Sequence, residues 1–166
     1  VAIFNLNKLL MKNIEVLLSK YGESHTNRTN KFIHWICVPL IMFSLIGLIM
    51  LIPFPFKIRS LNWAVIVLSM ALVYYYRLSK PFFFGFMIIS VVLIKVNQLL
   101  IEYCISNSWN AGLVLFLIFV IAWIGQFIGH KIEGKKPSFL EDLQFLLIGP
   151  AWLLHFVYKK MGVSYL

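Results

Sequence analysis

The run from Phe32 to Ile52 contains 21 residues and no formally charged side chain. About 20 consecutive apolar residues let a helix cross a bilayer, and a helix satisfies its own backbone polar groups there. Four more apolar stretches follow: Leu61 to Tyr76, Pro81 to Ile101, Trp109 to about His130, and Leu143 to Val157. Only 13% of the residues are charged, against about a quarter in soluble domains. The sequence therefore predicts an integral membrane protein.

The spacing of these stretches sets the expected fold class. They lie so close together that no second folding unit fits between them. We expect an all-α, polytopic membrane helix bundle with four to five spans, formed as a single membrane domain over residues 1–166. The number stays open because Gly149 and Pro150 interrupt the fifth stretch, which predicts either a kinked span or a re-entrant segment. Ahead of the spans, Ile3 to Leu18 shows the apolar spacing of an N-terminal amphipathic helix.

Basic residues are divided unequally between the two sides of this bundle. If the first four stretches cross the membrane, ten basic residues share one side: Lys8, Lys12, Lys20, Arg28, Lys31, Arg77, Lys80, Lys131, Lys135 and Lys136. The other side receives Lys57 and Arg59, with Lys159 and Lys160 if the fifth stretch crosses. Because cytoplasmic loops are enriched in basic residues, we expect a cytoplasmic N-terminus. The net charge of +9 is explained by this bias and by anionic lipid, so no nucleic-acid partner is predicted.

Three of the four histidines are expected at one depth in the membrane. His25 and His34 flank the start of the first span, and His130 ends the fourth span, which returns to the same side. On one continuous helix the nine-residue spacing would place His25 and His34 on opposite faces. We therefore expect the helix to begin between them, with Thr29 or Asn30 as its N-cap, so that both imidazoles can face His130.

Amide and carboxylate side chains accompany these histidines. Asn30 precedes His34 by four residues and Gln126 precedes His130 by four, so each amide lies one turn away on the same helix face. Metal-bound histidines usually donate their free ring N–H to such an acceptor. Glu133 shares the face of His130 and is a candidate carboxylate ligand, or a base that acts from behind the ligands. Imidazole suits iron, zinc, copper or nickel, and the carboxylate favours non-haem iron among them.

The fourth histidine, His155, lies 12 residues into the fifth stretch. A straight helix at 1.5 Å per residue would carry it roughly 18 Å into the membrane, away from the other three. It can join a common metal site only if Gly149 and Pro150 turn the chain back.

Two segments carry a family resemblance: YGESHTNRTNKFIHWICVPLI, from Tyr21, and AWIGQFIGHKIEGKKPSFLEDLQFLLIGPAW, from Ala122. They resemble the small membrane 2-hydroxy-fatty-acid dioxygenases, a family with many bacterial members. The most specific parts are the two histidines nine residues apart before Val38 and Pro39, and the Gln-Phe-Ile-Gly-His motif that ends at His130. The resemblance implies a site on the cytoplasmic side of the bacterial inner membrane, or of the endoplasmic reticulum in eukaryotic relatives.

The implied activity is iron(II)-dependent α-oxidation, in which O₂ and a long-chain 2-hydroxy fatty acid give an aldehyde one carbon shorter. The resemblance implies that His25, His34 and His130, with His155 as the fourth candidate, hold the iron. A substrate head at the water interface and a tail among membrane lipid would suit ligands at the mouth of an apolar bundle. Substrate-binding candidates are Arg28, Lys31 and Lys131, which are close enough in sequence to attract the carboxylate.

Two other functions fit the residues. A non-enzymatic lipid-binding or scaffold protein would tolerate replacement of its histidines. A bis-histidine membrane cytochrome would use two histidines that face each other across its core. A zinc protease is disfavoured because the chain has no His-Glu-x-x-His motif.

Overall fold

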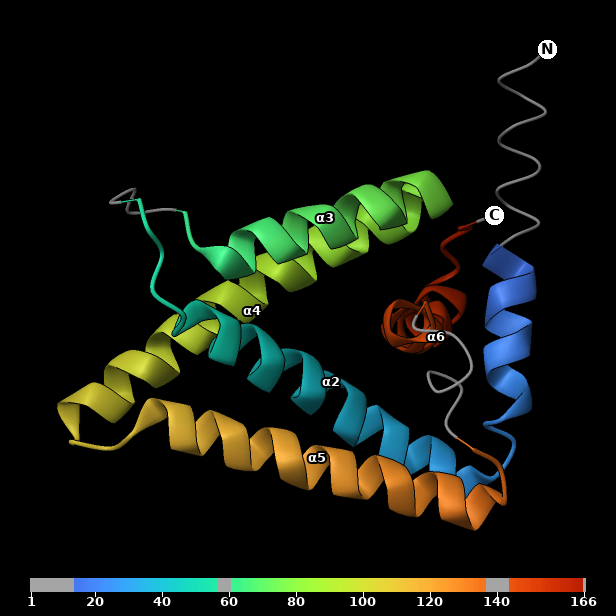
Figure 1. Ribbon diagram of the computed structural model, residues 1–166. Helices are drawn as coiled ribbons and strands as arrows, with labels where there is room; N and C mark the ends of the chain where they lie inside the picture. Colours follow the sequence, from blue (N-terminus) through green and yellow to red (C-terminus); the bar gives the residue numbers. More distant parts are fainter. Residues whose placement is uncertain (1–13, 57–60, 137–143, 166) are drawn as a thin grey trace.

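The computed structural model describes residues 14–56, 61–136 and 144–165 (Figure 1). An N-terminal helical segment covers residues 14–23. Five helices follow it: α2 (Arg28–Met50), α3 (Trp63–Leu78), α4 (Lys80–Ser106), α5 (Ala111–Glu133) and α6 (Phe145–Met161). Each of the five apolar stretches thus forms a helix, and no strand occurs in the described ranges. The predicted all-α fold class is confirmed.

Asparagine side chains begin three of these helices. Asn62 accepts a hydrogen bond from the backbone N–H of Val65, and Asn110 accepts one from Leu113. At α2 the cap is Asn27, whose side chain accepts from the backbone N–H groups of Thr29 and Asn30. The predicted break between His25 and His34 is confirmed, but the choice of Thr29 or Asn30 as the cap was wrong. Their N–H groups are the unpaired first-turn donors that a cap must satisfy.

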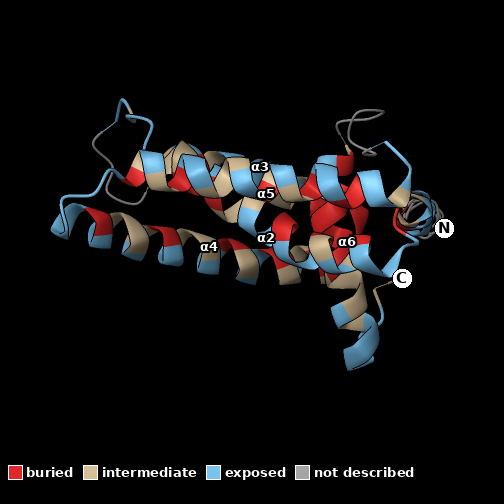
Figure 2. Cartoon of the chain, turned by 90° about the horizontal axis from the view of Figure 1, so that it is seen from below, coloured by how far each residue is buried: buried red, intermediate tan, exposed pale blue. Residues whose placement is uncertain are grey.

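The helices form a V (Figure 1). One arm is the pair α2 and α5, and the other is the pair α3 and α4, each pair in extensive contact. The arms converge where α2 and α4 end and diverge where these two helices begin; we call this second end the open end. Helix α6 lies across the open end, since Figure 1 shows it end-on and Figure 2 shows it running steeply across the other helices.

The outer surface of the arms is apolar. Helices α2, α4 and α5 are each long and apolar enough to cross a membrane, and α3 is a shorter apolar helix of 16 residues. Large apolar side chains point outward, among them Phe32 at 65% exposure and Ile121 at 65%. An exposed surface of this kind suits lipid rather than water. The helical membrane bundle predicted from the sequence is confirmed.

The fifth apolar stretch forms a single helix that runs across the arms. Helix α6 continues unbroken through Gly149 and Pro150 and packs its buried residues into the core at the open end. Ile14, Leu18 and Tyr21, spaced as one face of the N-terminal helical segment, belong to the same core. This agrees with the amphipathic pattern predicted there, of which residues 3–13 lie outside the described ranges. The axis of α6 runs steeply across the axes of the two arms and not parallel to them (Figure 2).

Candidate metal centre

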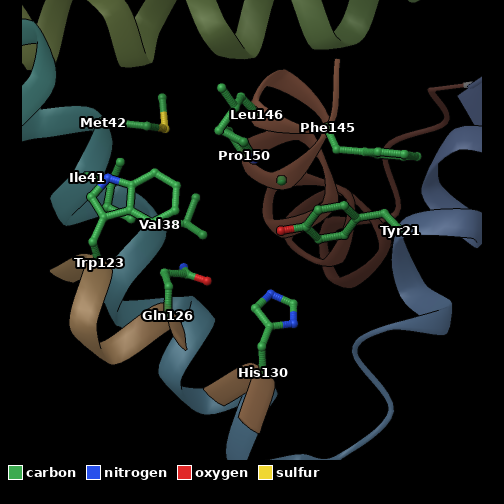
Figure 3. Close-up of a pocket in the computed structure, with 11 residues that line it drawn as sticks. Tyr21, Val38, Ile41, Met42, Trp123, Gln126, His130, Phe145, Leu146 and Pro150 are labelled. Carbon is green, nitrogen blue, oxygen red and sulfur yellow. The ribbon is translucent and has the colours of Figure 1, made fainter. Parts of the chain in front are cut away.

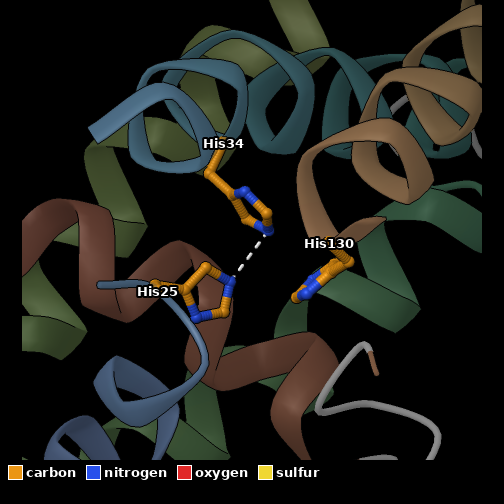
Figure 4. Close-up of side chains that lie close together, drawn as sticks. All are labelled: His25, His34 and His130. Atoms are coloured by element: carbon orange, nitrogen blue, oxygen red, sulfur yellow. Dashed lines mark hydrogen bonds between the residues drawn. The ribbon is translucent and has the colours of Figure 1, made fainter. Parts of the chain in front are cut away.

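Three histidines meet at the open end (Figure 4). His25 comes from the loop before α2, His34 from the second turn of α2, and His130 from the last turn of α5. All three are buried, and their ligand atoms lie within 4.8 Å of one another. The ring of His25 lies 4.2 Å from that of His34 and 5.0 Å from that of His130, between centroids. The capped break at Asn27 lets His25 turn back toward His34.

Backbone carbonyls fix the protonation of two of these rings. Nδ1 of His25 lies 2.6 Å from the carbonyl oxygen of Tyr21, and Nδ1 of His34 lies 2.9 Å from that of Asn30. A carbonyl only accepts, so each Nδ1 carries the proton. Burial, with a smaller contribution from neighbouring His34, lowers the pKa of His25 to about 3 and keeps its ring neutral. Both Nε2 atoms therefore present lone pairs.

The two Nε2 atoms lie only 2.9 Å apart. With both Nδ1 atoms protonated, two neutral rings would direct lone pairs at each other at this distance. A bound cation would turn this repulsion into two favourable bonds. The Nδ1 atom of His130 is a third nitrogen without a partner, because it is buried and has no hydrogen bond within the described part of the chain. Three histidine ligands leave a coordination position for water or substrate, as in catalytic rather than structural metal sites.

Glu133 lies outside the group formed by the three histidines, and its role as a ligand or as a base behind the ligands stays a prediction. One carboxylate oxygen accepts from the backbone N–H of Thr26 at 2.8 Å and from the Thr26 hydroxyl. The other accepts from the backbone N–H of Asn27 at 2.9 Å and from the Asn30 amide at 3.0 Å. Since these four donors occupy both oxygens, Glu133 ties the loop that carries His25 to the end of α5.

His155 also lies outside the three-histidine group. Its Nδ1 is hydrogen-bonded to the Tyr165 hydroxyl. The continuous helix α6 directs His155 toward the C-terminal segment, because Gly149 and Pro150 do not fold the chain back on itself.

The side chains of Asn30 and Gln126 do not pair with the histidines one turn away on the same helix, as their spacing predicts. It is the backbone carbonyl of Asn30 that holds the ring of His34, while the Asn30 amide nitrogen donates to Glu133 and to the carbonyl of Ser24 at 3.2 Å. Gln126 is buried and lines the small cavity with His130, but the Nδ1 atom of His130 has no hydrogen-bond partner within the described part of the chain. The Asn30 amide therefore acts across helices, through Glu133 on α5, which spacing along one helix does not reveal.

Cavities flank the cluster on two sides. One of about 490 Å³, lined by His25, Lys31 and His155 among others, lies against the N-terminal helical segment and the C-terminal tail. Another of about 60 Å³ lies among α2, α5 and α6, with Gln126 and His130 at one end and mostly apolar side chains around the rest (Figure 3). Of the three cations proposed for substrate, Lys31 lines the larger cavity, whereas Arg28 and Lys131 are exposed.

The sequence interpretation missed Tyr21. Its ring stacks on that of His25 at 4.2 Å between centroids, with 12° between the planes. Tyr21 stands four residues before His25, the same one-turn spacing that singled out Asn30 and Gln126, and this spacing was the available signal. Burial raises the pKa of the Tyr21 phenol, which keeps it a neutral hydrogen-bond donor.

The fold and this cluster together define a helical membrane protein whose three-histidine group could hold a metal ion. The chain belongs to the family described as 2-hydroxy-palmitic acid dioxygenase Mpo1-like, whose family model matches residues 11–161. It is 30% identical over 148 residues to the 2-hydroxy-palmitic acid dioxygenase MPO1 of Saccharomyces cerevisiae, an alignment that covers 87% of this chain and 79% of the yeast protein. No solved structure matches the chain.

Proposed function

We propose that this protein is an iron(II)-dependent dioxygenase that uses O₂ to convert long-chain 2-hydroxy fatty acids into aldehydes one carbon shorter. The observation that carries the proposal is the 2.9 Å approach of two Nε2 atoms whose Nδ1 partners are both protonated. That arrangement calls for a cation, and membership in a dioxygenase family supplies the reaction class.

Iron fits this donor set and this reaction class better than zinc. Three imidazole nitrogens suit several transition metals, but zinc has no redox chemistry to offer to O₂. Bound iron(II) would supply electron transfer to O₂ and a contact for the substrate's oxygen atoms. A bis-histidine cytochrome fits poorly, because a porphyrin between its two ligands needs far more than the 2.9 Å that separates the His25 and His34 nitrogens.

The cavities beside the cluster suit the two ends of a 2-hydroxy fatty acid. Lys31 in the larger cavity provides positive charge for the carboxylate as it approaches from the open end. An almost wholly apolar cavity of about 270 Å³ among α2, α4 and α6 shares Val38, Met42 and Pro150 with the small cavity at His130. The tail would lie along these apolar walls, where its burial contributes about 0.8 kcal/mol for each methylene.

The function is tested with purified protein loaded anaerobically with iron(II) and then exposed to air. We expect pentadecanal from 2-hydroxypalmitate and no aldehyde from palmitate, which lacks the hydroxyl group. We also expect 2-hydroxybutyrate to be a poor substrate, because its short tail reaches none of the apolar walls. If the iron-loaded protein produces no aldehyde from 2-hydroxypalmitate, the enzymatic proposal fails and a lipid-binding role replaces it.

We also propose that the open end faces the cytoplasm. Ten of the described basic residues lie at that end: Lys20, Arg28, Lys31, Arg77, Lys80, Lys131, Lys135, Lys136, Lys159 and Lys160. With α6 laid across the open end, Lys159 and Lys160 add to the cytoplasmic excess instead of opposing it.

Single cysteines report this orientation after Cys37 and Cys104, which are both buried, are replaced by alanine. We expect Ser108→Cys, in the turn between α4 and α5, to react with an impermeant maleimide added outside intact cells. Lys136→Cys should react only after the membrane is permeabilised. Labelling of Lys136→Cys in intact cells would reverse the proposed orientation.

A further inference from the structure

The hydroxyl group of Tyr21 has no acceptor within the described part of the chain. Tyr21 is 7% exposed as a residue, and its hydroxyl borders the small cavity rather than being enclosed by neighbouring side chains. A donor held away from bulk water without a partner loses part of the hydrogen bonding that it has in solution. The hydroxyl points into the small cavity that Gln126 and His130 line (Figure 3). A donor aimed into a cavity is placed to bond an acceptor that enters the cavity.

The position of this hydroxyl is fixed from several sides. The carbonyl of Tyr21 holds Nδ1 of His25, and its ring stacks on the same imidazole. Trp152 and Phe145 pack on the ring at 5.6 and 6.0 Å between centroids. A Cβ atom at Gly149 would come within 2.8 Å of the Tyr21 oxygen, so the space for the hydroxyl depends on the absence of a side chain at that position.

We propose that the Tyr21 hydroxyl donates a hydrogen bond to the carboxylate of the 2-hydroxy acid bound at the three-histidine cluster. This assignment rests on the proposed function, since it takes its ligand from it. His25 lines the larger cavity with Lys31, and His130 lines the small cavity with Tyr21. A carboxylate that passes Lys31 and reaches the histidines would therefore come to the edge of the small cavity, where the phenol can donate to it. A neutral O–H bonded to a carboxylate oxygen forms one of the stronger classes of hydrogen bond. Tyr21 is thereby a substrate-binding residue that also holds a candidate metal ligand.

The test is Tyr21→Phe, which keeps the ring, the stacking and the backbone carbonyl and removes one oxygen atom. The matched control is Tyr75→Phe, whose buried hydroxyl donates to the carbonyl of Leu147 at 2.7 Å and lies away from the cluster. We expect Tyr21→Phe to bind 2-hydroxypalmitate about 10- to 100-fold more weakly in anaerobic calorimetric titrations of the iron-loaded protein in nanodiscs. The thermal midpoint should fall for Tyr75→Phe, which loses a hydrogen bond, and not for Tyr21→Phe, which loses none.

A second ligand separates this contact from a general effect on the cavity. Hexadecane-1,2-diol keeps the tail and the neighbouring hydroxyl but has no carboxylate, so Tyr21→Phe should change its affinity by less than about threefold. Equal losses for the acid and the diol, or no loss for the acid, would overturn the assignment. Binding is measured without turnover, so a protein that binds the acid through Tyr21 yet makes no aldehyde refutes the proposed function and leaves the contact standing.

Discussion

Replacing His34 or His130 by alanine is expected to abolish iron binding and aldehyde formation together. Each substitution removes one of three nitrogen ligands, and water cannot be held at that place in the buried cluster. The loss of iron affinity should exceed the roughly 100-fold that follows from removing a residue that only supports a ligand. Iron stoichiometry by elemental analysis, measured on the same samples as the aldehyde yield, checks this result.

His155→Ala is the matched control for these two variants. It removes an imidazole of the same size at the same end of the protein, but one that is bonded to Tyr165 and lies outside the cluster. We expect it to retain iron at the parental stoichiometry. If His34→Ala and His130→Ala bind as much iron as the parent, the three-histidine site is wrong. If His155→Ala alone loses iron, the metal ligands include His155 on α6 and not the three histidines proposed.

The second large effect is expected at Glu133, although this side chain touches no metal ligand directly. Glu133→Ala removes the acceptor for four hydrogen bonds that hold Thr26, Asn27 and Asn30, and so releases the loop that carries His25. We expect a loss of roughly 2 to 3 kcal/mol in stability, discounted for the partial exposure of the carboxylate. Iron affinity should fall about 10- to 100-fold. Thermal unfolding and iron titration measure the two effects.

Excess metal distinguishes a loosened loop from a lost ligand. In Glu133→Ala all three histidines remain, so raising the iron concentration should restore occupancy and activity by mass action. The same concentration should not restore His34→Ala. Glu102→Ala, at an exposed position on α4, serves as the charge-matched control and should behave like the parent. If the Glu133→Ala protein keeps the parental stability and iron affinity, Glu133 does not hold the loop that carries His25.

The sequence predicted the helices well because the bilayer acts on each of them separately. The run from Phe32 to Ile52 must be helical in hydrocarbon whatever surrounds it, and the capped break before His34 follows from local chemistry. The roles of Glu133 and His155 could not be read in the same way. Glu133 meets Thr26 across 107 positions in sequence, and His155 is placed by the direction of α6, which depends on packing at the open end.

The two arms of the V contribute differently to the three-histidine cluster. His34 and His130 belong to the arm formed by α2 and α5, and His25 belongs to the loop that leads into it, whereas α3 and α4 supply no donor atom to the cluster. The second arm instead supports the cluster indirectly. The Tyr75 hydroxyl on α3 donates to the carbonyl of Leu147 on α6, and the Asn97 amide on α4 donates to the carbonyl of Phe43 on α2. Its outward residues need only be apolar enough for lipid, whereas a change at these inner contacts would shift the helices that carry or cover the three histidines.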